Sequence, residues 1–319
     1  MMITNFFASF IFSINVTLPI IILLGLGIFL GRRHILDDAF SQKAMKLIFN
    51  LTLPLLLFFN IYRGQIDYHS QIDLVIIAVL GTTILFISGE LVAAKFIDDK
   101  RERGTFVQAV FRGNNAILGL ALCVNAYGDA AYIPASIYSA IIVILYNTFG
   151  VLTLTRSLSN NKVSALSLIS RVAKNPLIIG IVLGIIMNYC AIKLPMPIEK
   201  TGHYLADITL PLAVLCTGAN INFRYMKVSS RVVSWGIFAR LIVAPIFMVL
   251  LAKIMGLSGM KLALIFLMSA TPLATATYAM VSAMGGNTTT VANIIGITTI
   301  GAMIVSSLGL MILTQLGWI

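Results

Sequence analysis

The stretch Phe111-Arg112-Gly113-Asn114-Asn115-Ala116-Ile117-Leu118-Gly119-Leu120 interrupts an apolar segment that is otherwise long enough to cross a membrane. A charge, a glycine and two adjacent carboxamides stand where the flanking Val, Ala, Leu and Ile residues predict a plain lipid-facing helix. An ionisable group within the bilayer costs at least ~2.5 kcal/mol unless it faces a cavity or a partner, so it indicates function by default. Irregular backbone survives at this depth only where protein or water surrounds it. We therefore expect one half of a substrate site in this stretch.

The composition is that of a membrane protein. Of the 319 residues, 59% are hydrophobic and only 10% are charged, whereas soluble domains carry roughly a quarter charged residues. The formal net charge of +11 comes mostly from short loops between apolar stretches. This distribution indicates a topology signal and argues against nucleic-acid binding. The three cysteines, Cys123, Cys190 and Cys216, are widely spaced and show no disulfide or metal motif, and no cofactor is expected.

The apolar stretches predict an all-α polytopic membrane protein with ten transmembrane helices. The predicted spans are 12–31, 42–62, 72–95, 105–127, 132–153, 174–192, 202–221, 231–254, 260–283 and 289–314. The long polar loop at 154–173 divides the chain. We expect a first five-helix repeat at 1–157, a cytoplasmic linker at 158–173 and a second, inverted five-helix repeat at 174–319. Most Lys and Arg residues follow spans one, three, five and seven, so the positive-inside rule places both termini outside the cell (inner) membrane.

An internal repeat supports the division. A shift of 157 residues superposes Pro19 on Pro176 and lays the segment 50–55 over 207–212, which aligns Pro54 with Pro211. Five spans are an odd number, so the second copy enters the membrane with the opposite orientation. Inverted repeats are typical of secondary transporters, whose site lies at the repeat interface near the bilayer midplane.

The same shift carries Arg112–Gly119 of the opening stretch onto Ser269–Ala276, where Pro272 interrupts span nine. Spans four and nine are therefore predicted to be broken crossing helices, whose half-helix N-termini attract an anion. The candidate substrate-binding residues are Arg112, Asn114, Asn115, Gly119, Thr271, Pro272 and Thr275. For Arg112 an alternative stays open, in which the side chain reaches back to the surface from a cytoplasmic helix end.

Spans two and seven each contain a proline that follows a polar residue by four positions. Pro54 and Pro211 each remove the hydrogen bond to the carbonyl four residues earlier, beside a polar side chain. Asp207 inside a span suits proton coupling, or it forms an ion pair with Arg240 or Arg112 that only holds helices together. Arg240 itself is expected to pair with an acid. The candidate coupling or gating residues are Asn50, Pro54, Asp207, Pro211 and Arg240.

Two pairs of glycines have a simpler interpretation. Gly27 and Gly31 in the first span, and Gly180 and Gly184 in the sixth, are spaced four residues apart. Small residues at this spacing mark the close packing of helices more often than a ligand site.

Several motifs resemble the auxin efflux carrier family and its bacterial malate and malonate permease-like members. They are Lys46-Leu47-Ile48-Phe49-Asn50-Leu51-Thr52-Leu53-Pro54, Asn114-Asn115-x-x-x-Gly119-Leu120, Ala270-Thr271-Pro272 to Tyr278, and Gly285-Gly286-Asn287. The resemblance implies scaffold and transport domains, crossing helices four and nine, elevator-type alternating access and a homodimer. It also implies that Asn114, Asn115, Thr271 and Pro272 lie in the substrate site. Two positions depart from the family pattern: Arg112, where a small residue is usual, and Ala121, where a proline is common.

The sequence thus predicts a secondary active transporter of a small organic anion, a mono- or dicarboxylate such as malate or malonate, or an auxin-like acid. Its partners are the substrate, the lipid bilayer and a second copy of the chain, with a proton or sodium as the coupling ion. The alternatives are a sodium-coupled carrier like the bile acid symporters, or a passive channel or facilitator with the same fold. An intramembrane enzyme is disfavoured, because no His, Cys or carboxylate cluster converges.

Overall fold

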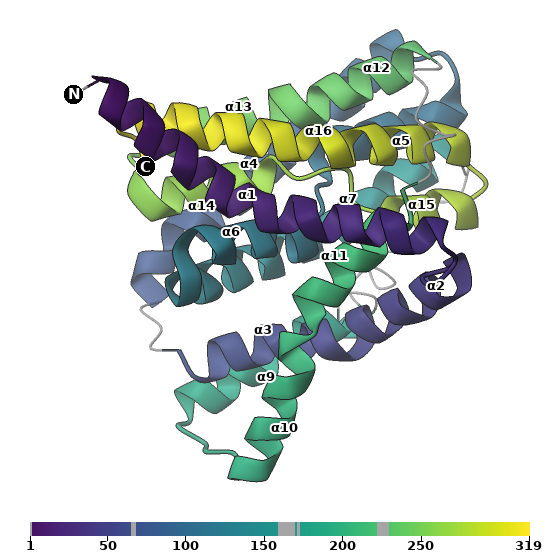
Figure 1. The fold of residues 1–319 in the computed structure, drawn as a ribbon. Helices are drawn as coiled ribbons and strands as arrows, with labels where there is room; N and C mark the ends of the chain where they lie inside the picture. The colour runs from purple at the N-terminus through teal and green to yellow at the C-terminus, as the bar shows by residue number, and fades with distance from the viewer. Residues whose placement is uncertain (1, 65–67, 159–169, 171–172, 222–229) are drawn as a thin grey trace.

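Helices make up nearly the whole of the structure, a computed structural model that describes residues 2–64, 68–158, 170, 173–221 and 230–319 (Figure 1). The first half contains α1 (Met2–Arg32), α2 (Asp38–Leu47), η1 (Ile48–Thr52), α3 (Leu53–Tyr62), α4 (Tyr68–Phe96), α5 (Lys100–Phe111), η2 (Asn115–Gly119), α6 (Leu120–Tyr127), η3 (Gly128–Ala131) and α7 (Tyr132–Leu158). The second half contains α9 (Pro176–Tyr189), α10 (Met196–Asp207), α11 (Thr209–Ala219), α12 (Arg231–Phe238), η5 (Ala239–Val243), α13 (Ala244–Ile254), α14 (Gly259–Ser269), α15 (Ala276–Ala283) and α16 (Thr288–Gln315).

The length and composition of these helices make the chain a multi-pass membrane protein. Among the described residues, 6 continuous helical segments are long and apolar enough to span a membrane, and α9 and α14 are shorter apolar helices. Helix is present within each of the ten predicted spans. The predicted linker at 158–173 lies almost wholly outside the described residues.

Prolines set the local irregularities of several helices. The segments η1 and η5 are π-helical turns, and each ends just before a proline, Pro54 in α3 and Pro245 in α13. A proline has no N–H to give to the carbonyl four residues earlier, so the preceding turn widens. At Pro211 the helix is interrupted and not merely widened: α10 ends at Asp207 and α11 begins at Thr209.

Glycines allow two pairs of helices to approach closely, as their spacing predicted. A Cβ atom on Gly27 of α1 would lie 2.2 Å from the carbonyl oxygen of Leu215 in α11. A Cβ atom on Gly180 of α9 would lie 2.5 Å from the carbonyl oxygen of Pro54 in α3. The first predicted span therefore packs on the seventh, and the sixth packs on the second.

Figure 1 shows how these pairs sit in the molecule. The helices α3, α9 and α10 pack together at the bottom of the view, and α11 runs from them to α1. The yellow α16 packs against the purple α1, and the two termini lie at the same end of this pair. The two interrupted spans are α5 with η2 and α6, and α14 with α15, and of these α6 packs against α1.

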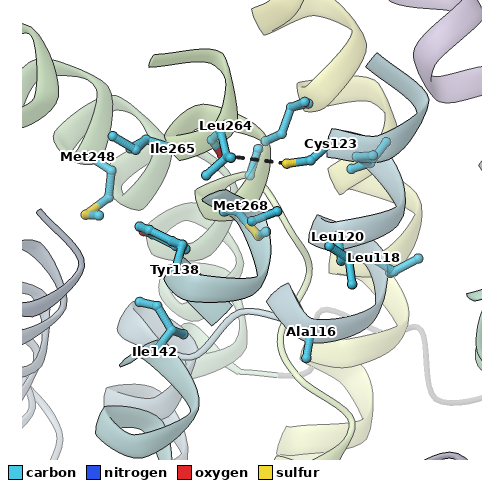
Figure 2. Packing of buried hydrophobic residues seen from close by; sticks show 14 of the residues in the cluster. Ala116, Leu118, Leu120, Cys123, Tyr138, Ile142, Met248, Leu264, Ile265 and Met268 are labelled. Atoms are coloured by element: carbon cyan, nitrogen blue, oxygen red, sulfur yellow. Dashed lines mark hydrogen bonds between the residues drawn. The ribbon is translucent and has the colours of Figure 1, made fainter. Parts of the chain in front are cut away.

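A continuous apolar core holds α6 against α7 and α14 (Figure 2). Leu118 of η2, Leu120 at the start of α6, Tyr138 of α7 and Met268 of α14 are all buried within it. The thiol of Cys123 points at the carbonyl oxygen of Leu264, 4.0 Å away. This packing fixes the positions of the chain segments on either side of the two helix interruptions.

Candidate functional site: a crossover of two interrupted helices

The two interrupted spans meet at one point. The helix α5 ends at Phe111 and α14 ends at Ser269, and beyond these ends Gly113 pairs with Leu273 in an isolated antiparallel bridge. The backbone N–H of Asn114 donates to the carbonyl of Pro272 at 2.8 Å, and that of Ala274 donates to the carbonyl of Arg112 at 3.2 Å. We call residues 112–115 and 270–275 the crossover. Both interruptions stand where the sequence predicted them.

The local sequence explains why the helices stop here. Arg112 and Asn114 have non-helical backbone conformations, with φ and ψ of −94° and 93° and of −85° and 58°. A Cβ atom on Gly113 would lie 2.3 Å from Oγ1 of Thr271 and 2.4 Å from Oδ1 of Asn115, so only glycine fits between the two segments. On the other side, the hydroxyl of Thr271 lies 2.9 Å from the carbonyl oxygen of Met268, the group that Pro272 leaves without its helical donor.

Buried polar side chains converge on the crossover. The side chain of Asn115 is 3% exposed, and its Oδ1 is within 3.2 Å of the hydroxyls of both Tyr146 and Thr271. Asn114 is also buried, and its Nδ2 has no hydrogen-bond partner. A buried amide without a partner costs about 1–3 kcal/mol, so its presence indicates a site for a ligand.

Two helix N-termini begin beside these side chains. Asn114 precedes the helical run of η2 and α6, Thr275 precedes α15, and neither residue caps its helix with a side-chain hydrogen bond. Uncapped N-termini expose backbone N–H groups at the positive end of the helix dipole. A Cβ atom on Gly119 would lie 2.6 Å from Sδ of Met268, so this glycine lets α6 approach α14. The crossover is therefore rich in donors and positive in potential.

Arg112 is buried at the crossover and does not reach back to the surface. The side chain is 4% exposed at the end of the 12-residue helix α5, which rises about 18 Å. Its Nη1 donates to Oε1 of Gln108 and to the carbonyl of Tyr146, both at 3.2 Å, and contacts Sδ of Met280 at 2.8 Å. Its Nη2 donates to Oδ1 of Asn147 at 3.2 Å. The alternative in which Arg112 extends to a cytoplasmic helix end is wrong, because α7 and α15 enclose it.

Arg240 also lies at the crossover, which the sequence did not predict. It sits in the π-helical turn η5, is 1% exposed, and donates from Nη2 to the carbonyl of Ser269. Its Nη1 is 3.5 Å from the position of a Cβ on Gly113. The expected pairing with an acid is wrong within the described residues, where none of the ion pairs includes Arg240. Its signal in the sequence was an arginine inside an apolar span with no acid nearby.

The remaining candidates lie away from the crossover. Asn50 is exposed, and its Nδ2 donates to the carbonyl of Lys46 at 2.8 Å. Asp207 is exposed, so the expectation of a buried carboxylate is wrong. Within the described residues it forms no ion pair with Arg112 or Arg240, so that alternative is wrong as well. The reason is its position: Asp207 is the last residue of α10, in a part of the molecule that neither arginine lines. Asp207 and Pro211 instead line a separate pocket of about 240 Å³, together with Pro19, Ile20, Leu23, Leu56, Ala121, Asn125, Tyr132, Ala206, Leu210 and Val214.

Comparisons with known proteins place the chain among membrane transporters. A sequence profile described as membrane transport protein matches residues 12–310. The "Uncharacterized transporter YfdV" of Escherichia coli K12 is 26% identical over 270 residues, covering 82% of this chain and 85% of the relative. An "Uncharacterized transporter" of Methanothermobacter thermautotrophicus is 23% identical over 268 residues, covering 82% and 86%. A "Putative malonate transporter" of Rhizobium meliloti is 22% identical over 215 residues, covering 65% and 66%.

The profile spans nearly the whole chain, including both interrupted helices. The resemblance drawn from the motifs around Pro54, Asn114 and Pro272 is thereby confirmed. The chain belongs to the family of membrane transport proteins, a family of transporters like the auxin efflux carriers.

Proposed function

We propose that the protein is a secondary active transporter that carries a small organic anion, a mono- or dicarboxylate, across the cytoplasmic membrane. The observation that carries this proposal is the crossover, where two interrupted helices are hydrogen-bonded to each other and present buried amides and uncapped N-termini. Helix N-termini and amide donors recognise carboxylates. The substrate contacts are Asn114, Asn115 and Thr271, with Gly119, Pro272 and Thr275 shaping the site.

The class of substrate follows from size and charge. The donors of the crossover are enclosed by α5, α7, α14 and α15, which favours a compact anion over an extended one. One relative is named as a malonate transporter, which supports short dicarboxylates such as malonate or malate as the first candidates. An auxin-like aromatic acid is the larger candidate of the same class.

For the mechanism we propose elevator-type alternating access by two inverted five-helix repeats. The reciprocal packing of α1 on α11 and of α9 on α3 through glycines supports a scaffold built from both repeats. The helices that carry the crossover would then move against this scaffold. We propose further that the protein is a homodimer of the inner membrane with both termini outside, and that a proton or sodium drives transport, with Asp207 and Asn50 serving coupling or gating.

The test is uptake of radiolabelled malonate and malate into proteoliposomes that contain the purified full chain. We expect saturable uptake and counterflow in the wild type. Asn115→Ala and Thr271→Val should abolish uptake. Thr217→Val should preserve it, because the hydroxyl of this buried threonine donates to the carbonyl of Ala213 in the same helix, α11.

The alternatives give different results in the same vesicles. A passive channel or facilitator would show neither counterflow nor accumulation against a gradient. A sodium-coupled carrier would require a sodium gradient for accumulation, and a proton-coupled one would require a pH gradient. Normal uptake in both Asn115→Ala and Thr271→Val would contradict the site at the crossover.

A further inference from the structure

Two guanidinium groups are buried at the crossover, and they use their donors differently. Both terminal nitrogens of Arg112 contact protein acceptors, and only its Nε has no partner. In Arg240, Nη2 donates to the carbonyl of Ser269 and the guanidinium also lies within hydrogen-bonding reach of the phenol of Tyr146, but no acceptor is in place for Nε or Nη1. An arginine carries five N–H donors, of which three are on these two nitrogens. Arg240 is thus the donor-rich group that the protein itself does not satisfy.

The charge of Arg240 is also uncompensated. The ion pairs within the described residues join Arg63 to Glu199, Arg156 to Glu90 and Lys261 to Asp73, and none reaches the crossover. The titratable side chains that interact with Arg240 are the phenols of Tyr138 and Tyr146. Burying a cation without a counter-charge is costly, so an arrangement of this kind persists where a ligand supplies the charge.

The unsatisfied atoms of Arg240 and of the crossover all lack an acceptor. Besides its own Nε and Nη1, the crossover leaves Nδ2 of Asn114 and Nε of Arg112 without partners, and all four are donors. A water molecule both donates and accepts and carries no charge, whereas a carboxylate accepts only and is anionic. A carboxylate therefore matches both the missing acceptors and the missing charge.

The guanidinium of Arg240 reaches the centre of the crossover. Its Nη1 lies 3.5 Å from the Cβ position of Gly113, the residue at the centre of the bridge between the two segments. It projects from η5, which packs against α5, and π-helical turns often occur at functional sites.

We propose that Arg240 binds the carboxylate of the transported anion, and that Arg112 is a positioning residue that ties the interrupted chain to α7. This assignment rests on the proposed function and sharpens it: the substrate must carry an ionised carboxylate, and its neutral amide is not a substrate. The sequence made Arg112 the candidate substrate contact and Arg240 the partner of an acid, whereas the structure distinguishes the two by how many of their donors already have protein acceptors.

The test measures binding to the full chain in detergent, with malonate, acetate and the neutral malonamide as probes. Malonate should raise the melting temperature of the wild type and malonamide should not, since ligand binding stabilises the folded state. Arg240→Gln should weaken malonate binding by about tenfold or more, because a hydrogen-bonded charge contributes that much. The melting temperature of the unliganded variant should stay the same or rise, because a buried unpaired charge is removed.

Two further variants complete the test. Arg112→Gln should lower the melting temperature without ligand, because it loses contacts to Gln108, Tyr146 and Asn147, yet it should still prefer malonate to malonamide. Arg240→Lys keeps the charge with fewer donors, so its affinity should fall about threefold or more but remain above that of Arg240→Gln.

Each outcome decides the assignment. Wild-type affinity for malonate in Arg240→Gln would overturn it. So would the reverse pattern, in which Arg112→Gln no longer prefers malonate to malonamide while Arg240→Gln keeps that preference. Should Arg240→Gln not fold, unchanged affinity in Arg240→Lys would overturn it as well. A wild type that binds and transports none of the acids would overturn the proposed function itself, which distinguishes the two failures.

Discussion

The backbone N–H of Asn114 donates to the carbonyl of Pro272 at 2.8 Å, and this bond joins the two halves of the chain where both are non-helical. The neighbouring bond from Ala274 to Arg112 completes an antiparallel pair. Each segment thus supplies the backbone partners that the other lost when its helix broke. This mutual satisfaction allows irregular backbone to persist inside a membrane protein.

Replacing Gly113 by alanine should disrupt this pairing. The new methyl group would lie 2.3 Å from Oγ1 of Thr271 and 2.4 Å from Oδ1 of Asn115. Both side chains are held by their mutual hydrogen bond and by bonds to Tyr146 and Met268, which a shift would disrupt. We expect a loss of about 1–3 kcal/mol in stability, the usual cost of overpacking, together with loss of transport. Thermal unfolding and malonate uptake would measure both effects. Gly89→Ala in α4, where the nearest atom is 3.4 Å from the new carbon, is the control that should behave as wild type.

Replacing Gly27 by alanine should separate α1 from α11. The added carbon would lie 2.2 Å from the carbonyl oxygen of Leu215, which belongs to the helix backbone and cannot rotate away. We expect a melting temperature several degrees lower. Gly25→Ala on the same helix has no atom within 4 Å of the new carbon and should be neutral. Equal melting temperatures for the two variants would contradict the close approach of these helices.

The native cysteines offer a test of orientation that needs no engineered label. Cys190 at the end of α9 is exposed, whereas Cys123 and Cys216 are buried. If both termini face outward, Cys190 lies on the outer side of the membrane. A membrane-impermeant maleimide should then label intact spheroplasts, and Cys190→Ser should abolish the label. Labelling only in inverted vesicles would show the opposite orientation.

One ion pair outside the apolar spans should make stability depend on pH. The hydrogen bond from Arg63 lowers the pKa of Glu199 from its ordinary value of 4.5. A group whose pKa is lower in the folded state stabilises the fold above its unfolded pKa and loses that contribution as the pH falls through the folded pKa. The difference in melting temperature between wild type and Glu199→Gln should therefore be present at neutral pH and shrink below pH 4.5.

That difference should also be small and sensitive to salt, because Glu199 and Arg63 are accessible to solvent. The same pair of melting curves at high ionic strength serves as the control. A difference that persists unchanged below pH 4 in high salt would mean that Glu199 stabilises the protein by packing and not by charge.

The sequence alone determined the features that depend on local chemistry. Apolar runs predict helices because a backbone in lipid must satisfy its own hydrogen bonds. The breaks at Gly113 and Pro272 could be predicted because glycine and proline change the backbone conformation and hydrogen bonding of the residues next to them. The repeat of 157 residues then related the two breaks, since it needs only the order of residues. Asn114, Asn115 and Thr271 followed as buried polar groups at the crossover.

Only the tertiary structure decided which charges meet. Arg240 is 128 residues from Arg112 in the sequence, and its place beside Gly113 depends on how η5 packs against α5. Asp207 was expected to lie inside the protein, but it is exposed and lines another pocket at the end of α10. Hydropathy and repeats report the order of residues along one chain, whereas the partner of a buried charge is set by the packing of helices that are distant in sequence. The roles of the two arginines follow from that packing.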